Sequence, residues 1–175
     1  DLEDRGFDVK VLTLSNSTES YKKGNVYYIG SLGAGKIYPE ARISATLRNK
    51  FIEEIKNWKP DIIHSQCEFS TFMMATKIAK KTSCPLVHTY HTIYEDYTHY
   101  FSPSKKVGKK MISVFSKAIA DRVEMIIVPS EKTREILKSY DIKDEKIKII
   151  PTGIEMPEQL EDKNKIRDYY RFDAS

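Results

Sequence analysis

The sequence has few cysteines, no long apolar run and no strong excess of one charge. Its two cysteines, Cys67 and Cys84, lack C-x-x-C spacing, so a disulfide scaffold is not expected and reduced thiols in a cytosolic protein are the simpler interpretation. No apolar run approaches the roughly 20 residues that cross a bilayer as a helix. The first residues, DLEDRG, also lack the basic and apolar regions of a signal peptide. These absences argue against a secreted mini-protein and against an integral membrane protein.

The composition is that of an ordinary globular domain. The 175 residues are 40% hydrophobic and 31% charged, which is enough apolar material for a sizeable core. The formal net charge of +4 and the pI near 8.9 are mildly basic. This charge suits an anionic ligand or membrane surface without requiring one.

Both ends of the sequence look like the middle of a longer chain. DLEDRGFDVKVLTL has the pattern of a last helical turn, a glycine cap and a strand, while KNKIRDYYRFDAS has the pattern of a helix that continues. We therefore expect that a strand and a helix precede residues 1–157, which would form one domain. Residues 158–175 would then be a linker toward a further, C-terminal domain.

Short apolar runs predict strands that are buried on both faces. Helical segments separate these runs, and strands that alternate with helices indicate crossover units and a mostly parallel α/β sheet. The predicted strands are Val9–Leu14, Val26–Ile29, Ile62–His64, Leu86–Tyr90, Met125–Val128 and Lys148–Ile150.

Four helical segments are expected between the strands. An apolar repeat at Ile43, Leu47, Phe51 and Ile55, joined by Trp58, predicts the first, which Pro60 would end. The others are predicted near Phe69–Lys81, from Pro103 to Arg122, and at Glu131–Tyr140 with Ser130 as the N-cap.

The polar residues that follow the predicted strands form the main functional signal. In open parallel α/β sheets, ligands bind beyond the carboxyl ends of the strands. Such residues are far apart in sequence but fall on one edge of the sheet: His64-Ser65-Gln66 with Glu68, His91-Thr92, Pro129-Ser130 and Thr152-Gly153.

Four segments resemble, in order and spacing, the N-terminal domain of family 4 retaining glycosyltransferases. They are DIIHSQCEFS, PLVHTYHTIYEDYTHYF, MIIVPSEKTREIL and IIPTGIE, and the likeness is greatest to bacterial diacylglycerol and glycosyl-diacylglycerol glucosyltransferases. The resemblance implies a GT-B architecture, in which two Rossmann-like domains face a cleft. It also implies transfer of a hexose from a nucleotide-sugar, usually UDP-glucose, with retention of configuration and without a metal or other cofactor. The first strand with its glycine-rich loop and the acidic donor-binding motif of that family are not in this sequence, so the fragment alone is expected to be inactive.

The resemblance gives His91 a catalytic role, because the family histidine contacts the donor sugar. A neutral imidazole at the end of the strand could bond a sugar hydroxyl or stabilise charge as the phosphate leaves; the alternative is a bond to a neighbouring backbone group. His88 should point to the other side of the strand and be structural. A metal site formed by His88, His91 and His99 is not expected, because their spacing matches no ligand pattern.

The neighbouring polar residues are predicted to hold the donor or the acceptor. Glu68 has an equally good explanation as an acid at a helix start. Glu95 and Asp96 could orient an acceptor hydroxyl or act as a base, and we favour positioning. Tyrosines of the same loop could line a sugar pocket or pack on the sheet. The predicted set is His64, Glu68, Thr92, Tyr94, Glu95, Asp96, Tyr97, Ser130, Thr152 and Gly153.

The segment SPSKKVGKKMISVFSKAIA predicts a basic amphipathic helix. We expect its apolar side to be buried on the sheet; its members are Val107, Met111, Val114, Phe115, Ala118 and Ile119. Its basic side could be an ordinary solvated face or could contact anionic lipid headgroups. No nucleic-acid motif accompanies it, so nucleic acid is not expected as a partner. The predicted membrane-contacting residues are Lys105, Lys106, Lys109, Lys110 and Lys117.

The sequence therefore predicts part of a hexosyltransferase that moves glucose from a nucleotide-sugar to diacylglycerol or monoglucosyl-diacylglycerol. Such an enzyme would be cytoplasmic and peripheral on the inner face of the cell membrane. The alternatives are transfer to a soluble or polymer acceptor, a GT-B-fold UDP-sugar epimerase, or a non-catalytic lipid-binding domain.

Overall fold

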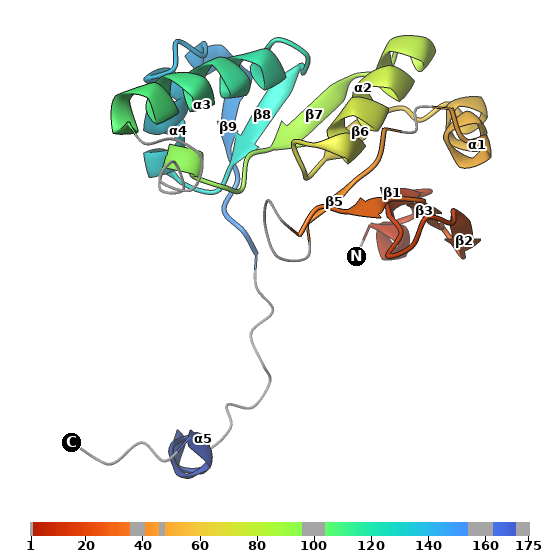
Figure 1. The fold of residues 1–175 in the computed structure, drawn as a ribbon, viewed down its shortest axis with the longest axis horizontal. Coiled ribbons are helices and arrows are strands. Elements are labelled where there is room, and N and C mark those ends of the chain that lie inside the picture. Colours follow the sequence, from red (N-terminus) through yellow and green to blue (C-terminus); the bar gives the residue numbers. More distant parts are fainter. Residues whose placement is uncertain (1, 36–40, 46–47, 96–103, 154–162, 171–175) are drawn as a thin grey trace.

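The computed structural model describes residues 2–35, 41–45, 48–95, 104–153 and 163–170 (Figure 1). Its largest sheet has four parallel strands in the order β6-β7-β8-β9. The helices α2, α3 and α4 connect these strands, so the predicted α/β fold with a parallel sheet and flanking helices is confirmed. The elements are β6 (Ile63–Ser65), α2 (Ser70–Thr82), β7 (Leu86–Thr89), α3 (Lys105–Ala120), β8 (Met125–Val128), α4 (Glu131–Lys138) and β9 (Ile147–Ile149).

Two smaller sheets lie N-terminal to this one, where the sequence predicted strands of a single sheet. In the first, β3 is central, with β1 parallel on one side and β2 antiparallel on the other; in the second, β4 and β5 are antiparallel. The elements are the 3-10 turn Glu3–Arg5, β1 (Val11–Leu14), β2 (Tyr21–Lys23), β3 (Val26–Ile29), β4 (Leu32–Gly33), β5 (Arg42–Ile43) and α1 (Lys50–Trp58).

The helical turn and glycine cap predicted at the N-terminus are confirmed. Gly6 has a φ of 85° and its N–H donates to the Glu3 carbonyl, which closes the 3-10 turn Glu3–Arg5. A side chain at Gly6 would be strained there, because only glycine adopts this backbone region without steric cost.

The prediction that Ile43 belongs to the first helix was wrong. Ile43 lies in β5 and pairs with Leu32 of β4. The helix α1 begins only at Lys50, because the Asn49 side chain accepts a hydrogen bond from the Phe51 N–H and so caps the helix. Leu47, the next member of the predicted stripe, lies outside the described residues.

The core has two apolar clusters, one in each half. One joins α2, α3 and α4 to the parallel sheet around Ile126, Val128 and Leu137; the other joins α1 and α2 to β3 around Tyr27 and Ile29. The helix α2 contributes to both, and Ile63 of β6 packs against both. These shared residues tie the N-terminal strands to the four-stranded sheet.

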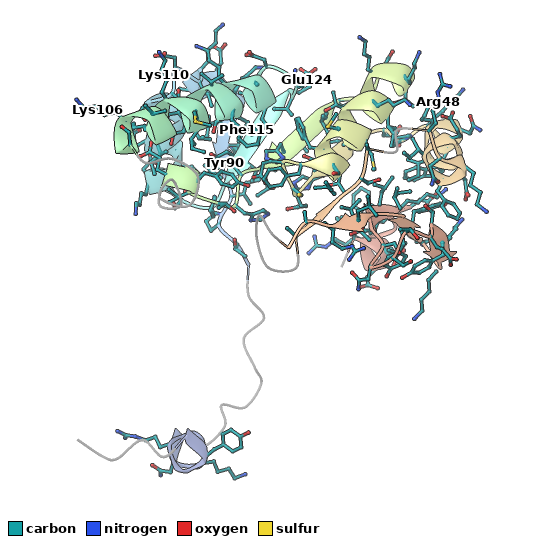
Figure 2. All side chains as sticks on the ribbon, viewed as in Figure 1. Arg48, Tyr90, Lys106, Lys110, Phe115 and Glu124 are labelled. Carbon is teal, nitrogen blue, oxygen red and sulfur yellow. The ribbon has the colours of Figure 1, made fainter. Side chains whose placement is uncertain are left out.

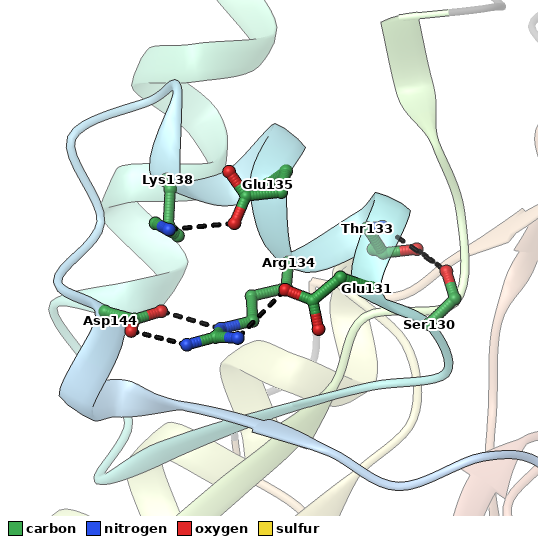
Figure 3. A network of polar contacts seen from close by, with 7 residues as sticks. All are labelled: Ser130, Glu131, Thr133, Arg134, Glu135, Lys138 and Asp144. Atoms are coloured by element: carbon green, nitrogen blue, oxygen red, sulfur yellow. Dashed lines mark hydrogen bonds and ion pairs between the residues drawn. The ribbon is translucent and has the colours of Figure 1, made fainter.

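The helix α4 shows how local polar contacts fix an element after a strand (Figure 3). As predicted, Ser130 is the N-cap, and its hydroxyl accepts from the Thr133 N–H at 3.3 Å. Arg134 donates to both Asp144 oxygens, at 2.7 and 2.5 Å. Those hydrogen bonds hold the pKa of Asp144 below its usual value, and they fix the 3-10 turn Asp144–Lys146 to α4 just before β9.

The prediction for the buried side of α3 was wrong for three residues. Val107, Met111 and Val114 are 55%, 52% and 63% exposed. The residues that face the core are Gly108, Ile112, Ser116, Ile119 and Ala120. Three of these, Gly108, Ser116 and Ala120, are small or polar, and Ser116 is tolerated there because its hydroxyl bonds the buried Tyr90 hydroxyl at 2.8 Å. The core stripe is therefore rotated relative to the most hydrophobic side of the helix.

The predicted membrane contact of the five α3 lysines stays a prediction. The Lys109 amine lies 3.2 Å from a carboxylate oxygen of Glu95, in the loop after β7. Lys106 and Lys110 instead lie on the outer side of the helix (Figure 2). The side chain of Lys105 lies outside the described residues. The last helix, α5 (Lys163–Tyr170), lies apart from the sheets (Figure 1).

Candidate active site at the carboxyl edge of the parallel sheet

His91 is the first residue beyond the sheet after β7. The Tyr90 N–H still donates to the Ile127 carbonyl at 2.8 Å, which continues the ladder by one residue. His91 itself is exposed, and its Nε2 lies 2.7 Å from Gln66 Oε1. Because an amide oxygen can only accept, Nε2 carries the proton and the Nδ1 of a neutral ring is an acceptor.

Gln66 also connects His91 to the end of β6. Its amide nitrogen lies 3.1 Å from His64 Nε2, and the same ring nitrogen lies 2.6 Å from Thr89 Oγ1. Partial desolvation of the ring lowers the pKa of His64, and electrostatic interaction with the neighbouring His88 and His91 rings lowers it further. His64 is therefore neutral at pH 7, and the edge presents neutral donors and acceptors of the kind that bind hydroxyl groups.

A second, buried polar chain lies beneath this edge. His88 is fully buried, as predicted, and its Nδ1 lies 2.6 Å from Ser65 Oγ. Its Nε2 faces Glu68 Oε1 at 3.6 Å, and the Tyr94 hydroxyl donates to Glu68 Oε2 at 2.7 Å. Burial opposes ionisation of Glu68, but the contacts with His88 and Tyr94 outweigh it and leave its pKa below the usual value.

Glu68 is thus placed under the edge, at 8% exposure, with Tyr94 between it and the loop. Its predicted role in binding a substrate stays a prediction. Tyr94 also packs edge-on against Tyr90 at 5.9 Å and Phe115 at 6.0 Å, which joins the start of the loop to α3. Burial raises the pKa of Tyr90 to about 12, and burial followed by the bond to Glu68 raises the pKa of Tyr94, so both hydroxyls stay protonated.

Glu95 is oriented by two other elements. Its Oε1 accepts from the Tyr140 hydroxyl at 2.5 Å and lies 3.2 Å from the Lys109 amine. Both contacts draw the start of the loop toward α3 and toward the end of α4. The remaining loop residues of the predicted site, Asp96 and Tyr97, lie outside the described residues, as does His99.

The structure brings only part of the predicted set together. His64, Thr92, Tyr94 and His91 lie around the ends of β6 and β7. Ser130 caps α4, and Thr152 and Gly153 are exposed beyond β9, so these three mark the far end of the same edge. The sequence placed Gln66 among the polar residues at the end of a strand, but Gln66 was not included in the predicted binding set, although the structure puts it between His64 and His91.

A surface hollow of about 500 Å³ lies at the amino end of β7, the opposite end of that strand, and is lined by residues such as Cys84, Leu86 and Arg122. Among the described residues, no group of three or more His, Cys, Asp or Glu side chains could hold a metal ion. Within the same residues, no helix is long and apolar enough to span a bilayer.

Comparison with known families decides the class of the protein. The model of Glycosyltransferase Family 4 matches residues 1–156. The chain belongs to glycosyltransferase family 4. The resemblance of the four sequence segments to this family is therefore confirmed.

Among curated proteins, the chain is similar to two alpha-monoglucosyldiacylglycerol synthases. It is 40% identical to that of Streptococcus pneumoniae over 108 residues, which are 62% of this chain and 24% of the relative. It is 32% identical to that of Acholeplasma laidlawii over 113 residues, which are 61% of this chain and 28% of the relative. The match thus spans about a quarter of the length of these relatives.

Among solved structures, the chain is similar to Anabaena Alr3699/HepE, which was crystallised in complex with UDP-glucose. The TM-score is 0.52 at 13% identity, with 93% of this chain and 50% of the other covered. At this identity the likeness shows the fold alone: the chain matches half of a GT-B glycosyltransferase.

Proposed function

We propose that this chain is the acceptor-side domain of a retaining glucosyltransferase that acts on diacylglycerol or monoglucosyl-diacylglycerol. The observation that carries the proposal is the 40% identity to an alpha-monoglucosyldiacylglycerol synthase. The nucleotide-sugar, which we infer to be UDP-glucose, would be held mainly by a second domain. Residues 158–175 would lead into that domain.

His91 is the residue that we assign to the donor sugar. Gln66 fixes its ring through Nε2, which leaves Nδ1 to accept from a sugar hydroxyl. A ring held by a neighbouring side chain loses little rotational freedom when the sugar binds, and positioning of this kind favours transfer. Retaining transfer by same-face attack uses the departing phosphate as base, so His91 need not move a proton.

The loop after β7 is assigned to the acceptor. Thr92, Tyr94 and Glu95 lie at its start, with Asp96 and Tyr97 next in sequence. The contacts of Glu95 with Tyr140 and Lys109 orient its carboxylate and support a positioning role rather than that of a free base. Exposed lysines of α3 would contact anionic headgroups, so the enzyme would be peripheral on the inner face of the cell membrane.

The test is transfer by the full-length protein of labelled glucose from UDP-glucose to diacylglycerol. His91→Ala is expected to lower kcat by at least about 100-fold, the effect of removing one group that stabilises a transition state. Its circular dichroism spectrum should stay unchanged, and its free energy of unfolding should stay within about 1 kcal/mol of the wild type. Lys132→Ala, an exposed change on α4, is the control and should transfer glucose at the wild-type rate.

Three outcomes would contradict the proposal. Near wild-type turnover by His91→Ala would remove the role of this residue. A product formed from the UDP-sugar without any acceptor would indicate an epimerase instead, and transfer only to a soluble acceptor would exclude the lipid.

A further inference from the structure

Five large apolar side chains are exposed on the outer side of α2 and α3. On α3 they are Val107, Met111 and Val114; at the start of α2 they are Phe69 and Met73, which are 55% and 58% exposed. We call these five residues the α2–α3 patch. They lie on the two helices that begin at the carboxyl edge of the sheet.

The two helices form one continuous surface. Val107, Met111 and Val114 are four and three residues apart, so they form a single stripe along α3. Phe69 and Met73 are four residues apart and do the same at the start of α2. The Phe69 ring stacks on Phe115 of α3, with ring centroids 6.1 Å apart, and this contact joins the two stripes.

The patch is not needed for the core. The buried stripe of α3 is Gly108, Ile112, Ser116 and Ile119, on a different side of the helix. Contiguous exposed apolar side chains of this kind are uncommon on soluble proteins and mark surfaces that bind a partner.

The charges around the patch indicate which partner. Lys106 and Lys110 project from the outer side of α3 (Figure 2), and Lys80 is exposed on α2. Neither α2 nor α3 contains a single Asp or Glu. A second copy of the chain would set lysines against lysines, which disfavours it as the occupant. Apolar side chains bordered by lysines fit an anionic bilayer, where the lysines meet headgroups and the apolar groups enter the acyl boundary.

We propose that the α2–α3 patch inserts into an anionic membrane surface. The contact is then hydrophobic as well as electrostatic, which a row of lysines alone would not provide. Any effect of this insertion on catalysis rests on the proposed function. Phe115 lies 6.0 Å from the Tyr94 ring, and Phe69 directly follows Glu68, so insertion brings the candidate active site to the surface in which a lipid acceptor lies.

The test is binding of the full-length protein to vesicles of phosphatidylcholine with about one third phosphatidylglycerol. The variant Met111→Ser/Val114→Ser removes apolar surface without changing charge. Its matched control is Leu32→Ser/Ile62→Ser, two apolar residues that are 62% and 57% exposed away from the patch. In 0.5 M NaCl, where charge interactions are screened within a few ångströms, the wild type and the control should remain bound. The patch variant should bind at least tenfold more weakly at both low and high salt.

Several results would overturn the proposal. The patch variant could bind as tightly as the wild type, or the wild type could lose all binding in 0.5 M NaCl, which would leave only the lysines. A change of the patch variant from dimer to monomer in analytical ultracentrifugation, with vesicle binding unchanged, would assign the patch to a second copy.

Vesicle binding and glucose transfer, both measured on the full-length protein, separate this inference from the proposed function. If the wild type binds vesicles in a salt-resistant manner but transfers no glucose to lipid, the proposed function fails and the insertion stands. If transfer occurs and the patch variant loses it equally for acceptor in vesicles and for a dispersed short-chain acceptor, the insertion fails and the function stands.

Discussion

His88 and His91 are three residues apart on one strand segment, yet their surroundings are opposite. His88 is fully buried between Ser65, Glu68 and the rings of Phe72 and Tyr90. His91 is exposed at the open end of the strand, and its ring bonds to another exposed side chain, Gln66. The comparison shows that being a histidine does not by itself determine the role of either residue. Position along the strand separates a histidine that holds the fold from one that can meet a ligand.

On the buried side of the strand, His88 and Glu68 form a polar pair. His88 Nε2 and Glu68 Oε1 are 3.6 Å apart, and within the described residues neither atom has a hydrogen-bond partner. Glu68 also receives the Tyr94 hydroxyl. Loss of Glu68 would leave the Tyr94 hydroxyl without its acceptor and the buried His88 ring without the facing carboxylate, which is the costly case for polar groups in a core.

The largest expected effect is therefore on stability. Glu68→Ala should lower the free energy of unfolding by about 3–5 kcal/mol, the range for breaking a buried pair by removing one partner. Urea unfolding of the full-length protein, followed by circular dichroism, measures it. The control Glu124→Ala changes an exposed carboxylate before β8 and should cost less than about 0.5 kcal/mol. Equal losses for both variants would show that the buried pair has no special weight.

A smaller effect is expected in the pH dependence of stability. The folded-state pKa of Glu68 is below its ordinary value of 4.5, so this group stabilises the fold above that value. The contribution is lost as the pH falls from about 4.5 through the lowered folded-state pKa. Glu68→Gln should flatten this acid limb in a series of urea titrations between pH 6 and pH 3. A limb as steep as that of the wild type would mean that Glu68 is not the group that titrates.

The exposed edge and the buried residues beneath it also differ in how well the sequence predicts them. Continuous apolar runs predicted the bounds of β3 and β8 correctly, and the carboxyl-edge rule brought His64 and His91 together. The burial of Glu68 could not be predicted, because it depends on the Tyr94 hydroxyl, which comes from a later segment of the chain. The core side of α3 was missed for a related reason. Gly108 and Ser116 carry no hydrophobic signal, and only the position of the Tyr90 hydroxyl explains why a serine is buried there.

The smallest expected effect on stability is at the exposed histidine. His91→Ala removes one hydrogen bond, to Gln66, and such a bond contributes about 0.5–1.5 kcal/mol in net terms, with exposed bonds at the low end. Gln66→Ala is the matched control, because it breaks the same bond and keeps the imidazole. Both variants should unfold within about 1 kcal/mol of the wild type in urea. Their transfer rates should differ, since only His91→Ala removes the ring that we assign to the donor sugar. If His91→Ala unfolds as readily as Glu68→Ala, the two histidines serve the fold alike, and position at the end of the strand no longer separates their roles.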